Sequence, residues 1–79
     1  MDEKHRHYLL DLGHLLRERA IEAQERSQAA KGSENEAFET GRALAYYEVI
    51  SLMLSQSETF GVPVEDLHLV GVLPDRDLL

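Results

Sequence analysis

Four side chains with metal-binding chemistry share one face of the first predicted helix. His7, Asp11, His14 and Glu18 follow i, i+4, i+7 and i+11 spacing, which places them on one side of an α-helix. Imidazole and carboxylate groups are ligands for zinc and similar divalent ions, and histidine titrates near neutral pH. The four residues are therefore the candidate metal-binding or pH-responsive site of the chain.

The same face also fits an ordinary solvated helix surface, and this is the interpretation that we favour. The sequence contains no H-E-x-x-H motif, and the second predicted helix carries no histidine that could complete a ligand set. We therefore predict no bound metal and no cofactor.

Motifs of known enzyme chemistries are missing from the sequence. There is no cysteine nucleophile, no G-x-S-x-G, no glycine-rich phosphate loop and no dinucleotide fingerprint. The serines of the second helix have no histidine at helical spacing, and a small helical hairpin leaves little room for a water-excluded cavity. We expect a protein that is not an enzyme.

The charge of the chain is acidic, with 15 Asp and Glu against 8 Lys and Arg and a net charge of -7. This composition offers no basic surface for phosphate neutralisation, so we expect no nucleic-acid partner. No apolar run approaches the ~18 residues that span a bilayer, and the charged N-terminus MDEKHRHY lacks the apolar region of a signal peptide. The expected location is the cytoplasm, without a membrane partner.

The elements that position these side chains are two long helices joined by a short turn. Leu, Ala, Glu, Arg and Gln dominate residues 2–31 and favour a first helix there. Gly32 suits a left-handed helix end, and Ser33 with Glu36 fits the S-x-x-E capping box of a new helix. A second helix over 34–60 would then run antiparallel to the first.

The C-terminal part of the chain is apolar and interrupted by proline and glycine. Gly61 and Pro63 end the second helix, and the acidic residues after Pro63 predict a short helix over 63–69. Residues 70–79 are expected to form a tail. The prediction is one all-α domain over residues 1–79.

Apolar residues of the first helix recur at helical spacing and predict the seam that faces the second helix. Gly13 interrupts this helix and should cost about 1 kcal/mol relative to alanine. The predicted seam consists of Tyr8, Leu9, Leu12, Leu15, Leu16, Ala20 and Ala23.

The second helix has more apolar surface than one neighbouring helix can cover. Its polar side chains occupy one arc, namely Glu48, Ser51, Ser55, Glu58 and Thr59. One apolar sector should face the first helix and contains Ala43, Tyr46, Tyr47, Ile50, Met53 and Leu54. A second sector stays exposed and is the predicted interface, formed by Phe38, Gly41, Ala45, Val49 and Leu52.

A domain of this size buries only about 60% of the surface of its unfolded chain, so an uncovered apolar sector is costly. A second copy, a different protein or the C-terminal tail could cover it. We favour a homodimer in which two hairpins form a four-helix bundle, with the tail assisting. The predicted function is a non-enzymatic protein–protein interaction module that serves as an adaptor or regulatory accessory. The alternatives are a metal- or pH-responsive helical protein and an acidic, antitoxin-like inhibitor of a basic partner.

Overall fold

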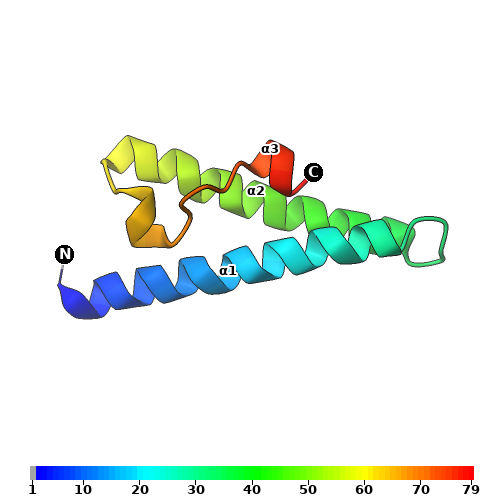
Figure 1. The fold of residues 1–79 in the computed structure, drawn as a ribbon, viewed down its shortest axis with the longest axis horizontal. Coiled ribbons are helices and arrows are strands. Elements are labelled where there is room, and N and C mark those ends of the chain that lie inside the picture. The colour runs from blue at the N-terminus through cyan, green and yellow to red at the C-terminus, as the bar shows by residue number, and fades with distance from the viewer. Residues whose placement is uncertain (1) are drawn as a thin grey trace.

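The computed structural model describes residues 2–79 and contains only helices and connecting segments. Helix α1 spans Glu3–Ala29 and helix α2 spans Glu36–Phe60. A 3₁₀ helix, η1, follows at Val64–Leu67, and a short helix, α3, at Pro74–Asp77. The two long helices pack against each other as an antiparallel hairpin, which confirms the predicted all-helical architecture (Figure 1). The assembly of two hairpins into a bundle stays a prediction.

Helix α1 begins with a side-chain cap. The Asp2 carboxylate accepts a hydrogen bond from the His5 backbone N–H at 2.9 Å and contacts the His5 ring nitrogen Nδ1 at 2.7 Å. These hydrogen bonds, with the backbone one contributing most, hold the pKa of Asp2 below its ordinary value. The acidic start predicted for the first helix therefore acts as an N-cap.

The turn between the helices uses the predicted residues with different hydrogen bonds. Gly32 has a φ of 81°, the left-handed conformation expected of it. Helix α2 begins later than predicted, with Asn35 at the N-cap, so the reciprocal capping box is wrong. The Ser33 hydroxyl instead donates to the Ala30 carbonyl at 2.7 Å, and a Glu36 carboxylate oxygen accepts from the Gly32 N–H at 2.7 Å. Both side chains therefore stabilise the turn itself.

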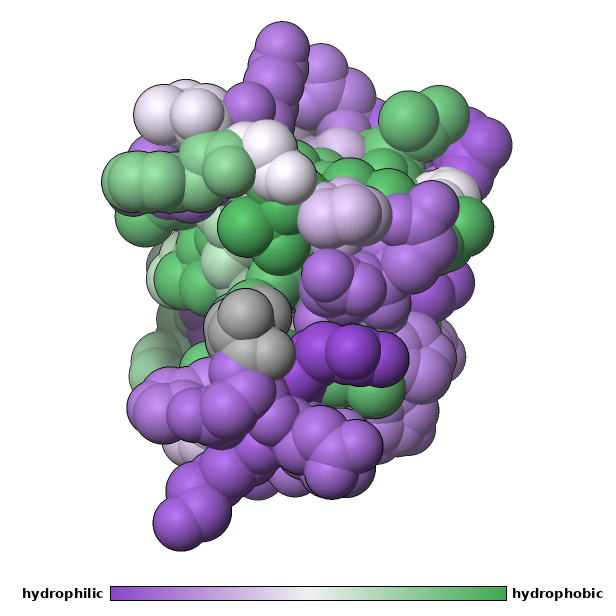
Figure 2. All heavy atoms as spheres, turned by 90° about the vertical axis from the view of Figure 1, so that its left-hand side faces the viewer, coloured by the Kyte–Doolittle hydropathy of each residue, from purple (hydrophilic) through white to green (hydrophobic). Residues whose placement is uncertain are grey.

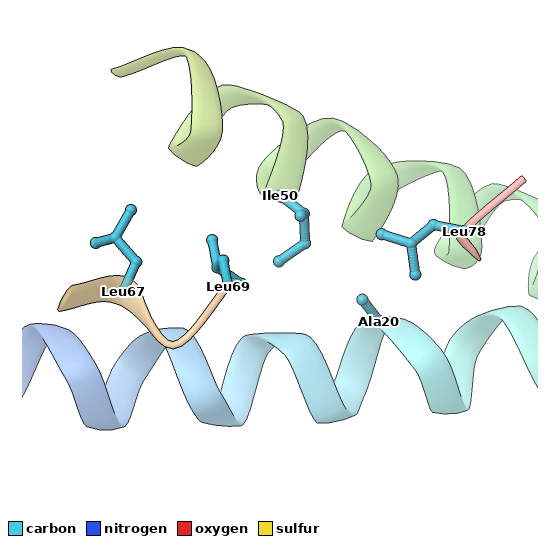
Figure 3. Packing of buried hydrophobic residues seen from close by; sticks show 5 residues of the cluster. All are labelled: Ala20, Ile50, Leu67, Leu69 and Leu78. Carbon is cyan, nitrogen blue, oxygen red and sulfur yellow. The ribbon is translucent and has the colours of Figure 1, made fainter. Parts of the chain in front are cut away.

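The chain after α2 folds back so that η1 lies between the two long helices, whereas α3 lies against α2 on the other side in the view of Figure 1. Figure 1 shows α1 and α2 close together near their connecting turn and further apart at the other end, where η1 fills the space. Figure 3 shows side chains from η1 and the tail pointing into the region between α1 and α2. The buried core contains residues from all three segments, namely Ala20, Ile50, Leu67, Leu69 and Leu78.

The tail is more ordered than the sequence suggested. Its α3 helix was not predicted, and it is held by a hydrogen bond from the Tyr47 hydroxyl to the Asp75 carboxylate. Arg17 of α1 donates to the carbonyl oxygens of His68 and Val70 at 3.3 and 3.5 Å. The tail therefore packs against the faces of α1 and α2 that form the core. The prediction from the sequence was instead that the tail helps to cover the exposed apolar sector of α2.

This insertion changes which face of α1 is buried. Gly13 is buried, and a Cβ built on it would lie 2.8 Å from the Leu67 carbonyl carbon and closer still to the carbonyl oxygen. The backbone of η1 can approach α1 here only because residue 13 has no side chain. Tyr8 and Leu15 are consequently exposed, so their assignment to the seam was wrong, while Leu9 and Leu16 pack on the core.

Candidate functional site

Helix α2 presents an apolar surface that the rest of the chain leaves exposed. All five predicted interface residues are exposed in the single chain, with exposed fractions of 70% for Phe38, 40% for Val49 and 63% for Leu52. Gly41 and Ala45 lie between them at helical spacing and are also exposed. The prediction that α1 leaves this sector open to solvent is confirmed, but its use as an interface is a separate proposal.

Two further residues extend this surface to the end of the helix. Gln56 and Phe60 are exposed, and 74% of Phe60 is accessible. The predicted interface omitted them, although the same helical spacing continues from Val49 and Leu52 to these positions. We call the complete surface the α2 outer face, and it consists of Phe38, Gly41, Ala45, Val49, Leu52, Gln56 and Phe60.

The α2 outer face carries no charged side chain. The nearest charges on α2 are Glu48, which is exposed, and Arg42, which lies seven residues before Val49 on the same side of the helix and whose guanidinium lies 5.3 Å from the centre of the Tyr46 ring. A cation over an aromatic face is electrostatically favourable, so this contact holds Arg42 at the side of the helix. The outer face therefore resembles the uncharged centre of an interface with polar groups at its rim.

A hollow of about 330 Å³ opens beside the C-terminal part of the outer face. It exists because η1 holds α1 and α2 apart at this end, and because the Ser57 hydroxyl donates to the Val62 carbonyl and folds the chain back. Almost all of its surface is apolar. It is lined by Leu9, Leu52, Met53, Gln56, Ser57, Phe60, Val62 and Leu67.

Figure 2 views the molecule from this end. Hydrophobic side chains gather in its upper part, over the end of α2 and the segment that follows, while hydrophilic side chains cover the start of α1 below. The hollow shares Leu52, Gln56 and Phe60 with the outer face, so the two features form one continuous apolar surface. A continuous exposed apolar surface of this kind is a candidate binding site.

The histidine and acid face of α1 forms a second, more polar site. His14 Nε2 lies 3.2 Å from Glu18 Oε1, and the His14 ring lies beside the His68 ring, with 4.7 Å between their centres. His7 and Asp11 line the same shallow hollow as these two histidines, but Glu18 does not. The His68 contact was missed because His68 reaches α1 only through the folded tail.

Within residues 2–79, no group of three or more histidine or acidic side chains is arranged to hold a metal ion. The four candidate ligands thus share a face, as predicted, without forming a ready-made coordination site.

Comparison with protein-family models, with curated proteins and with solved structures found no match to this chain. Across residues 2–79, none of the helices combines the length and apolarity needed to cross a bilayer.

Proposed function

We propose that the chain is a non-enzymatic protein–protein interaction module that acts as a homodimer through the α2 outer face. One observation carries the proposal: exposed rings and aliphatic side chains form an uncharged surface along the length of α2, although the tail already fills the space between the helices. Exposed apolar surface is unfavourable in water at about 25 cal/mol per Å². Burying it against a second copy removes that cost.

The dependence of thermal stability on protein concentration tests this proposal. Dimerisation stabilises the folded state by mass action, so the melting temperature of the wild type should rise with protein concentration. Val49→Glu places a charge at the centre of the outer face and should abolish that dependence. Ser55→Glu adds the same charge on the exposed polar arc and should preserve it. A melting temperature independent of concentration in the wild type would contradict the proposal.

A pH-responsive role is the second candidate, favoured by the contact between the His14 and His68 rings. Positive charge on both rings would be repulsive across the 4.7 Å between their centres, whereas a charged His14 would also attract Glu18 Oε1 at 3.2 Å. The variant His68→Gln should remove any loss of stability that the wild type shows between pH 7.5 and pH 5.5. An unchanged pH dependence in this variant would exclude the histidine pair as a sensor.

A further inference from the structure

The two halves of the α2 outer face have complementary shapes. Its N-terminal half combines one projecting ring, Phe38, with the small residues Gly41 and Ala45. Its C-terminal half carries the larger side chains Leu52 and Phe60 and adjoins the apolar hollow. The Phe38 ring could fill the apolar hollow only if the two were brought into contact.

Within one chain this contact is impossible. Phe38 and Gln56 are separated by five turns of a continuous helix, or about 27 Å at 1.5 Å per residue. The Phe38 ring therefore cannot reach the hollow of its own molecule, whereas Phe38 of a second chain can.

We infer that the occupant of the hollow is Phe38 of a second copy, in a dimer whose two α2 helices run antiparallel about a twofold axis near Val49. This inference rests on the proposed function. Val49 lies midway between Phe38 and Phe60, so the axis places Phe38 of each copy beside Gln56 and Phe60 of the other. The same axis sets Gly41 and Ala45 opposite the larger side chains of the partner copy.

A parallel pair of α2 helices would fit less well. It would place the projecting rings against each other, the small residues against each other and the hollows against each other, which leaves voids that protein interfaces avoid. The antiparallel pair fills both hollows and also aligns the helix dipoles favourably. A twofold axis makes the two contacts identical, as in most homodimers.

The available area is sufficient for such a dimer. The exposed fractions of Phe38, Leu52 and Phe60, with the smaller contributions of their neighbours, amount to on the order of 600 Å² per copy when an aromatic side chain is taken to bury about 150–250 Å². Two copies would bury about 1,200 Å², the lower end of the range for specific interfaces. The contact thus matches a reversible dimer better than a permanent one.

Cysteine cross-linking tests the inference, because the chain has no cysteine of its own. In the antiparallel arrangement, position 41 of one copy lies beside position 56 of the other. A mixture of the Gly41→Cys and Gln56→Cys variants should therefore give cross-linked dimers with a short bismaleimide. Neither variant alone should do so, because identical positions then lie on the order of 20 Å apart across the axis. Cross-linking of each variant with itself would overturn the antiparallel register.

A Val49→Cys variant separates this failure from failure of the proposed function. Val49 lies at the axis, so this variant should cross-link to itself in the proposed register and also in a parallel pair of α2 helices. If Val49→Cys cross-links while the mixture does not, the dimer stands and the register is wrong. If Val49→Cys fails as well, an axis at Val49 is wrong, and both proposals fall if the wild type also stays at 9.0 kDa in sedimentation equilibrium.

Phe38→Ala provides an independent measurement on the anchor residue. Loss of a ring that fills an apolar hollow should raise the dimer dissociation constant roughly tenfold to a hundredfold. Leu73→Ala is the matched control, since Leu73 is an exposed apolar residue of the tail that lies outside the outer face. An equal effect of the two substitutions would refute the role of Phe38.

Discussion

Replacing Gly13 by alanine should destabilise the fold, which is the opposite of the usual effect inside a helix. Alanine is favoured over glycine in a helix by about 1 kcal/mol. At position 13, however, the new Cβ would lie 2.8 Å from the Leu67 carbonyl carbon and closer to its oxygen. The Leu67 carbonyl group is part of the backbone and cannot rotate away as a side chain could. The clash can therefore be relieved only by moving η1 away from α1.

The size of the effect follows from what η1 holds in place. Leu67 and Leu69 are 5% and 1% exposed, and burying one such side chain contributes about 1.5–3 kcal/mol. Partial exposure of both leucines should cost more free energy than the roughly 1 kcal/mol that alanine adds to the helix. We therefore expect the free energy of unfolding to fall by about 2 kcal/mol. For a chain of this length, that loss lowers the melting temperature by roughly 8–16 °C.

Gly41→Ala is the matched control, because a Cβ at Gly41 meets nothing within 4 Å in the single chain. It should raise the stability by up to about 1 kcal/mol. Both substitutions are made in the Val49→Glu background, so that contacts between copies do not contribute. Thermal and urea unfolding followed by circular dichroism measure the two changes. A Gly13→Ala variant as stable as its parent would refute the close approach of η1 to α1.

Three further substitutions probe the core, the tail and the turn. Ile50→Ala, at a fully buried position, should cost about 2–5 kcal/mol in urea unfolding; a loss below 1 kcal/mol would contradict the burial. The Arg76 side chain, with smaller contributions from other groups, lowers the pKa of Asp77 from 3.8 to about 2. The ionised Asp77 therefore stabilises the fold above pH 3.8, and this stabilisation is lost as the pH falls through about 2. The Asp77→Asn variant should lose less stability than the wild type between pH 4 and pH 2. An identical loss in both proteins would argue against the contact between Arg76 and Asp77. Ser33→Ala removes the hydrogen bond to the Ala30 carbonyl and should cost about 1 kcal/mol in the same unfolding assay, whereas no change would show that the turn does not need it.

The hairpin could be predicted from the sequence because its signals are local. Helix formers, a glycine at the left-handed position and the serine and glutamate of the turn all act within a few residues of where they occur. The exposed sector of α2 could be predicted for a similar reason, since helical spacing alone decides which residues share a face. The errors in the turn are the start of α2, which lies at Glu36 instead of residue 34, and the atoms that Ser33 and Glu36 contact.

The position of the tail could not be predicted, and the errors in α1 follow from it. Apolar residues separated by Pro63, Gly71 and Pro74 have no regular spacing that would indicate a packing direction. From the sequence alone, Gly13 is a residue that destabilises the first helix. In the structure it is the residue of α1 against which the backbone of η1 packs. The assignment of Tyr8 and Leu15 to the seam was wrong because nothing in the sequence shows that η1 packs against the face of α1 that carries Gly13.

The mass of the wild-type chain in solution tests the central claim most directly. Sedimentation equilibrium over a range of micromolar concentrations should show reversible association toward about 18 kDa, twice the 9.0 kDa of one chain, and the Val49→Glu variant should remain near 9.0 kDa. A wild type that stays at 9.0 kDa throughout that range while remaining folded would contradict dimerisation through the α2 outer face.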